Sequence, residues 1–270
     1  MITSKANAHV KQIRALRQRK ERERDGLFFV EGIRITGEAA QLGARLESIV
    51  FAPELLKSAF AHTLVQEQQR RGVACLELSA EVFESLSAKE GPQGIGAVVR
   101  QRWEPLEAVQ PLSELCWVAL EAAQDPGNIG AILRTSDAVG GAGLILLDHS
   151  ADPYDPEAVR ASMGAVFAQR LVRATFDEFA AWKARDRAPY RVIGASGDAP
   201  HDYQAVAYQP PQVLLMGSER QGLLADQQAA CDLLVKIPMV GRSDSLNLAV
   251  AASVVLYEMF NQGRSTGSKE

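Results

Sequence analysis

The sequence has little of what several large classes of protein depend on. It contains only three cysteines, Cys75, Cys116 and Cys231, which are far apart and odd in number, so they match neither a disulfide framework nor a zinc-ligand pattern. Its four histidines are scattered as well, and we expect no metal site and no Cys-His nucleophile. This cysteine usage favours a reducing compartment, and we expect a cytoplasmic protein.

We expect neither a membrane span nor a secretory leader, and the sequence has little that resembles a nucleotide-binding glycine motif. The longest apolar stretch, 246–260, is shorter than the roughly 20 residues that cross a bilayer, and it contains Asn247 and Glu258. The N-terminus is polar and basic, with no apolar segment behind it. No GxxxxGK[ST] pattern occurs, and Gly94-x-Gly96 lacks the third glycine of a dinucleotide fingerprint. We therefore expect no membrane partner, and nucleoside triphosphates and NAD are disfavoured as ligands.

Positive charge is scarce overall but concentrated at one end of the chain. The formal net charge is −4 at pH 7. Residues 1–25 nevertheless hold eight lysines and arginines against three acidic residues, which leaves the rest of the chain acidic. Such an asymmetry favours contact with nucleic-acid phosphates over a solvated helix with internal ion pairs. We therefore treat 1–25 as a basic N-terminal arm, with Lys11 and Arg14 as candidate RNA contacts.

The region 26–100 predicts a small α/β domain. Apolar residues make up 47% of the 270 residues and charged residues 23%, which is typical of a globular chain with one or two domains. Short apolar segments alternate here with helix-length ones. The expected strands are 27–30, 46–51, 73–78 and 94–99, and the expected helices are 31–42, 53–71 and 80–86. Residues 101–113 contain Pro105 and Pro111 and are predicted to form a linker.

The region 114–262 predicts a second α/β domain with a mostly parallel sheet, because its short apolar strands are separated by helices. The expected strands are 117–120, 144–147, 191–195, 213–216 and 233–237, the expected helices are 131–139, 156–167, 223–230 and 246–260, and a turn is expected at 125–130. The last helix is apolar on nearly every face, so it must be buried in a core or against a partner subunit. We expect the tail 263–270 to be disordered.

Three polar or glycine-rich segments follow expected strands of this second domain, after Leu120, Met216 and Ile237. Ligands of parallel sheets bind at the carboxyl ends of the strands, where these segments lie. A ligand without phosphate, held by backbone groups of the loops, needs no phosphate-binding motif. S-adenosylmethionine is such a ligand.

Together, the three segments resemble the motifs of the SpoU (TrmH-type) family of RNA ribose 2′-O-methyltransferases in the SPOUT superfamily. The matching segments are DPGNIGAILRTSDAVG (125–140), LLMGSERQGL (214–223) and IPMVGRSDSLNLAVAAS (237–253). The stretch 28–99, with VEGIR at 30–34, is similar to the L30e-like RNA substrate-binding domain of the same family. The resemblance covers nearly the whole chain and adds Arg34 to the candidate RNA contacts.

The resemblance implies a fold that the strand pattern alone would not predict, in which the C-terminal segment of the SpoU methyltransferase domain threads a trefoil knot. It also implies a homodimer that holds S-adenosylmethionine in the knot, contacted by backbone groups of Gly217, Ile237 and Leu246. The implied activity is 2′-O-methylation of a ribose in structured RNA, with 23S ribosomal RNA preferred. A tRNA ribose methyltransferase and a non-catalytic RNA-binding or ribosome-assembly factor remain as alternatives, whereas a nucleotide-cofactor oxidoreductase has no supporting motif.

The resemblance also implies active-site roles for five polar residues. Arg134 is the main candidate. Because arginine is effectively never neutral in proteins, we expect it to stabilise the attacking alkoxide or bind the adjacent phosphate rather than to act as a base. The other four are Asn128, Glu219, Ser245 and Asn247. Residues of these types at helix starts can also serve simply as caps or first-turn carboxylates.

Overall fold

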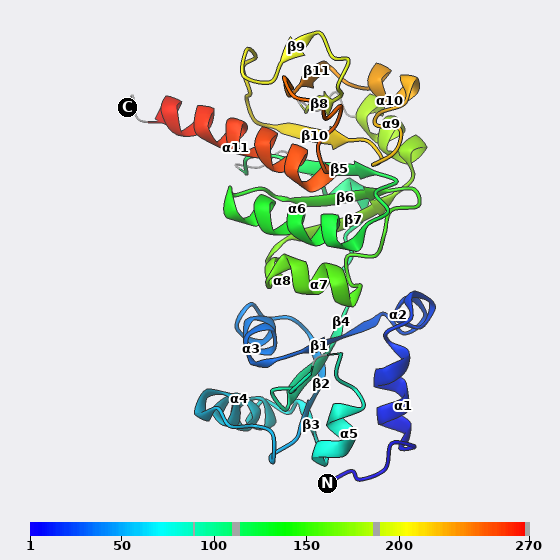
Figure 1. Cartoon of the computed structure of the whole chain (residues 1–270), viewed down its shortest axis with the longest axis vertical. Coiled ribbons are helices and arrows are strands. Elements are labelled where there is room, and N and C mark those ends of the chain that lie inside the picture. Colours follow the sequence, from blue (N-terminus) through cyan, green and yellow to red (C-terminus); the bar gives the residue numbers. More distant parts are fainter. Residues whose placement is uncertain (89, 110–113, 186–189, 268–270) are drawn as a thin grey trace. The chain divides into compact units, whose positions relative to one another are not determined.

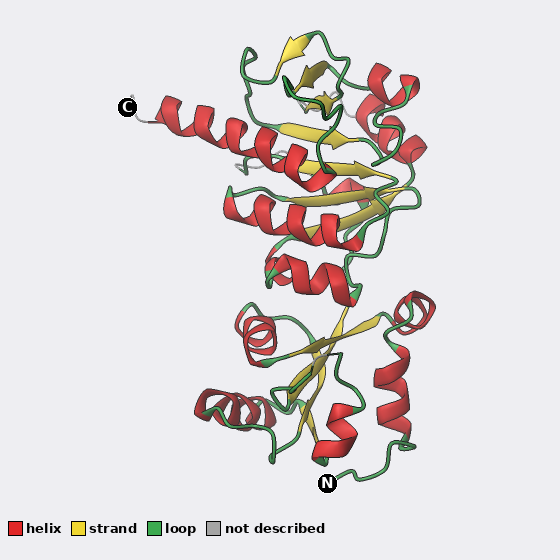
Figure 2. Ribbon diagram, viewed as in Figure 1, coloured by secondary structure: helices red, strands yellow, loops and turns green. Residues whose placement is uncertain are grey.

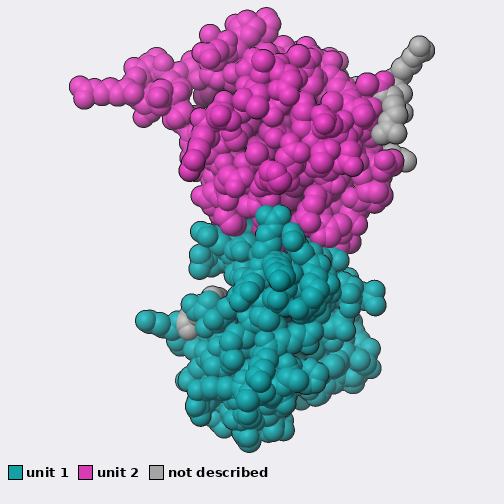
Figure 3. All heavy atoms as spheres, turned by 90° about the vertical axis from the view of Figure 1, so that its right-hand side faces the viewer, with its two compact units in different colours: residues 1–101, 154–167 teal, residues 102–153, 168–270 magenta. Residues whose placement is uncertain are grey.

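The chain divides into two compact units. The structure, a computed structural model, describes all residues except 89, 110–113, 186–189 and 268–270. Unit 1 comprises residues 1–101 and 154–167, and unit 2 comprises residues 102–153 and 168–270 (Figure 3). The segment 154–167, which the sequence analysis assigned to the second α/β domain, is thus part of unit 1.

Unit 1 is built on a four-stranded mixed sheet in the order β1-β4-β2-β3 (Figure 2). Its strands are β1 (Leu27–Glu31), β2 (Leu46–Phe51), β3 (Ala74–Glu77) and β4 (Ile95–Arg100). β4 pairs antiparallel with β1 and β2, whereas β3 runs parallel to β2. All four strands form where the sequence places apolar runs. β4 is buried along nearly its whole length, which indicates cover on both of its faces.

The helices of unit 1 are α1 (Ala8–Ala15), α2 (Arg19–Asp25), α3 (Ile33–Gln41), α4 (Ala59–Arg70), α5 (Ala80–Glu84) and α7 (Pro156–Ser162). The expected helix 53–71 begins only after Ser58, whose hydroxyl caps it by accepting from the N–H of Ala61. The expected helix 156–167 is interrupted at Met163 and Gly164, which both have positive φ angles, before the short α8 (Ala165–Ala168).

Segment 1–25, set apart on charge as a basic arm, is packed into unit 1 instead. Val10, Ile13 and Leu16 are at most 4% exposed and share one apolar core with Val82 and Phe83 of α5. Their spacing of three residues places them on one stripe of α1 and its C-cap, Leu16, which buries this helix against the domain.

Unit 2 contains a seven-stranded sheet in the order β7-β6-β5-β10-β8-β11-β9, and all of its pairings are parallel. The strands are β5 (Trp117–Glu121), β6 (Gly143–Leu147), β7 (Arg170–Ala174), β8 (Arg191–Ala195), β9 (His201–Asp202), β10 (Gln212–Met216) and β11 (Leu233–Lys236). Every residue of β5, β6 and β10 is buried, as expected of parallel strands covered on both faces. The predicted α/β class with a parallel sheet is therefore confirmed.

The helices of unit 2 are α6 (Pro126–Ala138), α9 (Phe176–Arg185), α10 (Ala225–Ala229) and α11 (Leu248–Gly267). α6 and α11 lie side by side (Figure 1), and the hydroxyls of Thr135 and Ser253 meet at 2.9 Å between them. Phe179 and Trp182 of α9 pack in a core cluster with Trp117 and the alternate apolar residues of the central strands.

Two segments expected to be irregular belong to unit 2. In the expected linker, a short 3₁₀ helix, η1 (Leu106–Ala108), packs Leu106 into the core, and Glu104 forms an ion pair with Arg170 at 2.7 Å. The part of the linker at 110–113 lies outside the described residues. Residues 263–267 of the expected disordered tail continue α11, and 268–270 again lie outside the described residues.

Candidate active site

Three loops leave the carboxyl edge of the unit 2 sheet. They follow β5, β10 and β11, which lie close together in the order β5-β10-β8-β11. Because these strands are parallel, their carboxyl ends meet at one edge. The loops are 122–125, 217–224 and 237–247, and they hold most of the residues expected in the site.

The first loop ends in a helix cap rather than in the turn expected at 125–130. The carboxylate of Asp125 accepts hydrogen bonds from the backbone N–H groups of Gly127 at 2.7 Å and of Asn128 at 3.4 Å. Pro126 occupies the first helical position, where its missing N–H is not needed. α6 therefore begins at Pro126 and carries Asn128 in its first turn, where only 6% of that residue is exposed.

A series of hydrogen bonds joins the three loops through Asn128. The Asn128 Nδ2 atom donates to Glu219 Oε1 at 3.1 Å, and its Oδ1 atom accepts from Asn247 Nδ2 at 2.9 Å. The Glu219 carboxylate also accepts from the backbone N–H groups of Gln124 at 3.1 Å and Asp125 at 3.3 Å. The structure thus brings together three of the five polar residues expected in the site, one from each motif.

These bonds favour the ionised form of Glu219. Partial burial of the carboxyl opposes ionisation, but the hydrogen bonds from backbone N–H groups, foremost that of Gln124, and from the Asn128 amide outweigh it. The pKa of Glu219 is therefore held below its usual range. A negative charge at this position fixes the Asn128 amide with its nitrogen toward Glu219 and its oxygen toward Asn247.

Asn247 also caps α11. Its Oδ1 atom accepts from the backbone N–H groups of Ala249 at 2.9 Å and Val250 at 3.2 Å. Ser245, two residues earlier, is exposed and donates to Asp244 at 3.2 Å. It is not connected to the Asn128 hydrogen bonds. The roles predicted for both residues in the site remain predictions.

Gly217 closes the turn that carries Glu219. A side chain at Gly217 would overlap the backbone of Gly222 and Leu223. The N–H of Gly222 donates to Ser218 O at 2.9 Å, and Gly222 has a φ of 63°, which favours glycine. This close approach explains the glycine without a ligand, and the predicted backbone contact of Gly217 with a cofactor remains a prediction.

The loop 237–247 offers backbone groups and apolar side chains to a ligand. Among the described residues, none of the backbone hydrogen bonds involves 237–246. Ile237 is half-buried, and the exposed apolar side chains include Leu246, 40% exposed, and Met239, 38% exposed. This combination suits a ligand with both an apolar ring and polar edges, although contacts from Ile237 and Leu246 remain predictions.

Arg134 stands apart from these hydrogen bonds. It is exposed on α6, six residues after Asn128, which places it about 9 Å further along the helix and about 120° around it. Within the described part of the chain, its side chain has no hydrogen-bond or ion-pair partner. Its guanidinium is therefore available to an anionic ligand, and its predicted catalytic role remains a prediction.

Glu121 is a titratable residue at the same edge that the sequence analysis did not single out. It is the last residue of β5, is 6% exposed, and has an Oε2 atom without a hydrogen-bond partner among the described residues. Burial raises the pKa of Glu121 to about 7, and the carboxyls of Asp148 and Asp226 add to this effect. The sequence feature that could have identified Glu121 is its position as an acidic residue directly after the apolar run 117–120.

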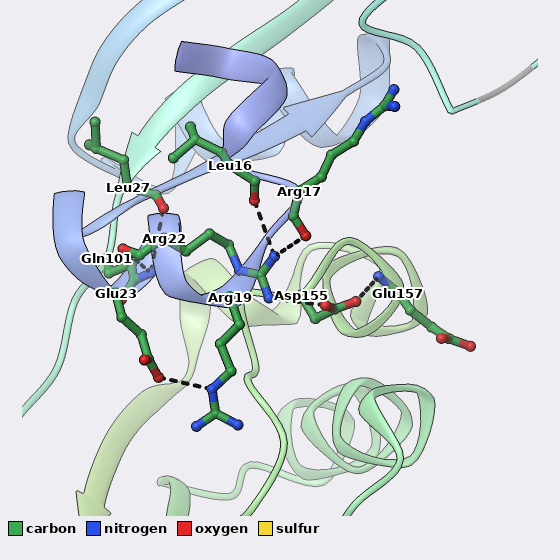
Figure 4. Close-up of polar contacts among 9 residues, drawn as sticks. All are labelled: Leu16, Arg17, Arg19, Arg22, Glu23, Leu27, Gln101, Asp155 and Glu157. Atoms are coloured by element: carbon green, nitrogen blue, oxygen red, sulfur yellow. Dashed lines mark hydrogen bonds and ion pairs between the residues drawn. The ribbon is translucent and has the colours of Figure 1, made fainter. Parts of the chain in front are cut away.

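In unit 1, much of the positive charge of segment 1–25 is used internally. Arg22 is 1% exposed, and its Nη1 atom donates to the carbonyl oxygens of Leu16 at 3.1 Å and Arg17 at 2.8 Å (Figure 4). Its Nη2 atom lies 3.0 Å from the carboxylate of Asp155. Arg22 therefore joins α1, α2 and α7 within unit 1, a structural role that a count of charges does not reveal.

The three candidate RNA contacts differ in availability. Lys11 is exposed on α1. Arg14 is half-buried and donates to Ser85 Oγ at 3.0 Å. Arg34 is exposed and pairs with Glu38 at 2.9 Å along α3. Their contact with RNA remains a prediction.

Metal-binding and membrane-spanning features were searched within the described ranges. No group of three or more His, Cys, Asp and Glu side chains in them is arranged to hold a metal ion. None of the described helices combines the length and apolarity that crossing a bilayer requires.

The fold and the three connected loops define an α/β protein of the class in which ligands bind at the carboxyl edge of a parallel sheet. The same chain also contains a unit with a mixed sheet. The chain belongs to the SpoU rRNA methylase family, whose model matches residues 116–257. The model of the MRM3-like substrate binding domain matches residues 7–97. The family predicted from the three motifs is thereby confirmed, and the second match extends nearly to the start of the chain, across α1 and α2.

Relatives align with nearly the whole chain. A 23S rRNA (uridine(2479)-2′-O)-methyltransferase from Streptomyces viridochromogenes is 33% identical, with 97% of this chain and 92% of the relative covered. The 23S rRNA (guanosine(2553)-2′-O)-methyltransferase RlmP of Bacillus subtilis (strain 168) is 29% identical, over 96% of this chain and 98% of the relative. The crystal structure of an AdoMet-bound rRNA methyltransferase from Sinorhizobium meliloti has a TM-score of 0.87 and 35% identity, covering 96% of this chain and 97% of that one.

Proposed function

We propose that this protein transfers the methyl group of S-adenosylmethionine to a ribose 2′-hydroxyl of 23S ribosomal RNA. The proposal is supported by the names of the two full-length relatives and by the AdoMet-bound rRNA methyltransferase structure. The single observation that carries it is the Glu219–Asn128–Asn247 hydrogen-bond series, in which all three family motifs meet at the carboxyl edge of the sheet.

The residues at this edge fit S-adenosylmethionine. The loop 237–246 has free backbone groups for the polar edges of the ligand, and Leu246 and Met239 offer exposed apolar surface for its adenine. Gly217 keeps the neighbouring loop free of a side chain. When bound, this ligand supplies an electrophilic sulfonium methyl group. We assign its contacts to backbone groups of Gly217, Ile237 and Leu246.

The remaining task of the chain is to orient the ribose and to stabilise the negative charge that develops on its attacking oxygen. Arg134 is the residue we assign to this task, because its exposed guanidinium is unpaired within the described part of the chain. Glu219, Asn128 and Asn247 hold the loops in register, and Ser245 is assigned to the polar surface facing the substrate. We further propose that unit 1 binds RNA, with Lys11, Arg14 and Arg34 as contacts.

We also propose that the protein is a cytoplasmic homodimer whose C-terminal segment forms a trefoil knot, as the family resemblance implies. A partner subunit would cover the exposed apolar residues of α11, of which Val250 is 49% and Tyr257 is 47% exposed. A ribosomal RNA substrate is consistent with a cytoplasmic location.

Mapping of ribose 2′-O-methyl marks across ribosomal and transfer RNA, with and without this gene, tests the substrate. We expect one mark in 23S ribosomal RNA to depend on the gene. A dependent mark in tRNA alone would establish the tRNA alternative. No dependent mark, together with no heat of S-adenosylmethionine binding in the presence of RNA, would establish a non-catalytic RNA-binding factor.

The Arg134→Ala variant tests the assigned mechanism. We expect methyl transfer to fall by at least a hundredfold, which corresponds to about 3 kcal/mol of lost transition-state stabilisation. The affinity for S-adenosylmethionine should stay within threefold of wild type. Arg102→Ala, at another exposed arginine of unit 2, is the matched control and should leave both quantities unchanged. Loss of donor binding in Arg134→Ala would contradict the assigned role.

A further inference from the structure

Unit 1 contains a cavity that the proposed methyl transfer does not use. Its volume is about 440 Å³, within the range of pockets that hold ligands of nucleotide size. All of its lining residues belong to unit 1, from 16–38, 86–88, Gln93 and 154–163. Its apolar surface comes from Phe29, Ile35, Tyr154 and Met163, of which Met163 is 39% exposed.

The VEGIR segment, singled out by the sequence analysis, forms one wall of this cavity. Gly32 turns the chain from β1 into α3 with a φ of 120°, a conformation that favours glycine. The carboxylate of Glu31 is fixed at this wall by hydrogen bonds from Ser87 Oγ and from the N–H of Ala88. The VEGIR motif therefore has a local structural role, which is to form one wall of the cavity.

Carboxylates in the wall are largely neutralised inside unit 1. Glu38 pairs with Arg34, and Asp155 pairs with the buried Arg22. The Oε2 atom of Glu38 is nevertheless buried without a hydrogen-bond partner among the described residues. Because that oxygen is shielded from solvent, what the wall offers to a ligand is mainly its apolar surface.

Two arginines of the lining carry charge that no carboxylate among the described residues offsets. Arg17 is exposed and donates only to the carbonyl oxygens of Leu86 at 2.8 Å and Ser87 at 2.9 Å. Arg160 is exposed in the last turn of α7 and has no partner in the described part of the chain. The lining as a whole holds four carboxylates, Glu31, Glu38, Asp155 and Glu157, against the arginines at 17, 34 and 160, so its attraction for an anion is local to Arg17 and Arg160.

An apolar slot with two exposed arginines in its lining matches an unstacked nucleotide. The base would lie against Phe29, Ile35 and Met163, and its phosphates would reach Arg17 and Arg160. Proteins read RNA mainly through such splayed-out bases of single strands and loops. The unit that contains the cavity is the one matched by the model of a substrate binding domain.

We propose that this cavity binds one unpaired nucleotide of the RNA substrate, away from the methylated ribose, and so selects the RNA. The inference rests on the proposed function for the identity of the substrate as RNA, but it assigns a separate site. It predicts that changes to the cavity alter the KM for RNA and leave kcat and the affinity for S-adenosylmethionine intact.

The test uses the full chain, a 23S ribosomal RNA fragment that contains the mapped mark, and three variants. Arg160→Glu reverses a charge at the mouth, and Ile35→Trp fills the slot. Arg70→Glu, on the exposed end of α4 in the same unit and outside the cavity, is the matched control. We expect Arg160→Glu to raise the KM for RNA at least tenfold and to reduce the salt dependence of binding by about one unit of slope.

Ile35→Trp should raise the KM at least fivefold, the lower end of what the loss of one stacked base costs, and leave the salt slope unchanged. Arg70→Glu should change the KM less than twofold. Should Ile35→Trp fail to fold, Arg160→Glu decides alone, because its side chain is exposed. Unchanged KM values in both cavity variants, in a wild-type protein that methylates the fragment, would overturn the cavity proposal and leave the proposed function standing.

Cross-linking separates the two proposals if the wild type shows no methyl transfer. RNA containing 4-thiouridine, irradiated on the full chain, should label peptides that span 29–35 or 154–163. Such labelling without methylation would support the cavity and contradict the proposed function. Labelling confined to other peptides would overturn the cavity proposal, whatever the activity.

Discussion

Replacing Glu219 by glutamine tests whether the hydrogen bonds through Asn128 act as one unit. The Glu219 carboxylate accepts from the N–H groups of Gln124 and Asp125 and from the Asn128 amide, whereas glutamine can accept with only one of its two terminal atoms. A hydrogen bond to a charged group contributes about 1.5–3 kcal/mol when it is shielded from water. Because Glu219 is exposed, water replaces part of this, and we expect the free energy of unfolding of unit 2 to fall by about 1–2 kcal/mol.

Tryptophan fluorescence during urea unfolding measures this loss for unit 2 alone. The chain has three tryptophans, and all of them, Trp103, Trp117 and Trp182, lie in unit 2. A double-mutant cycle with Asn247→Ala then measures coupling between two side chains that are linked through Asn128. We expect a coupling energy of about 0.5–1 kcal/mol.

Glu178 provides the matched control. Its exposed carboxylate accepts from the N–H of Thr175 at 2.7 Å and from the Thr175 hydroxyl at 3.1 Å, and these bonds lower its pKa as well. Glu178→Gln should lower the stability less than Glu219→Gln does, and its effect should be additive with that of Asn247→Ala. If Glu219→Gln is also additive with Asn247→Ala to within about 0.3 kcal/mol, the three residues do not act as a unit and the reasoning is refuted.

The pH dependence of stability gives a second readout of the same substitution. The pKa of Glu219 in the folded state lies below its ordinary value of 4.5. Its contribution to stability is therefore complete above that ordinary value and is lost as the pH falls through the folded-state pKa. Wild type and Glu219→Gln should differ fully at neutral pH and converge in acid.

Two further predictions concern buried charges. Arg22→Met should destabilise unit 1 by about 3–5 kcal/mol, because it leaves the carbonyls of Leu16 and Arg17 and the Asp155 carboxylate without their guanidinium partner. The unfolding transition measured by circular dichroism should then shift, whereas the transition measured by tryptophan fluorescence should not. A shift of both transitions would contradict the assignment of Arg22 to unit 1. Glu121→Gln should leave the free energy of unfolding unchanged near pH 4 and raise it above pH 7 by up to about 3 kcal/mol. The reason is the pKa of Glu121, which folding raises to about 7, so that the wild type loses stability as the pH rises from 4.5 to 7. Urea titrations of the tryptophan signal at pH 4 and pH 8 check this, and an equal effect at both pH values would exclude it.

Much of the sheet of unit 2 was predictable because parallel strands buried on both faces read as continuous apolar runs. Residues 117–120, 144–147 and 213–216 are such runs, and all three form strands. The strand β7 was missed because Arg170 and Arg173 interrupt its apolar pattern. In the fold, their guanidinium groups lie over the rings of Trp117 and Trp103 at 4.9 and 4.3 Å from the ring centres. Such cation–π contacts depend on residues distant in the sequence.

The start of α6 was misinterpreted although its signal was present. Asp125-Pro126 is typical of a turn, but an acidic N-cap followed by proline at the first helical position is equally typical of a helix start.

The structure of the basic segment 1–25, in contrast, had no signal in the local sequence. The burial of Arg22 depends on Asp155, which is 133 residues away, so no local pattern could reveal it. Deleting the segment would remove the core residues Val10, Ile13 and Leu16 and expose their partners Val82 and Phe83, and point variants such as Lys11→Ala therefore test RNA contact more cleanly.

The geometry of the site also bears on which group could remove the proton from the ribose hydroxyl. A general base works best when its pKa lies near the operating pH, and the hydrogen bonds to Glu219 move its pKa further below that pH. Glu219 is therefore a poor base, and both of its carboxylate oxygens are already engaged by Gln124, Asp125 and Asn128. Asn128 and Asn247 carry no ionisable group, and arginine as a residue type does not act as a base in proteins. In the mechanism that we propose, the loops orient the ribose, the charge on Arg134 stabilises the developing alkoxide, and the proton leaves to solvent.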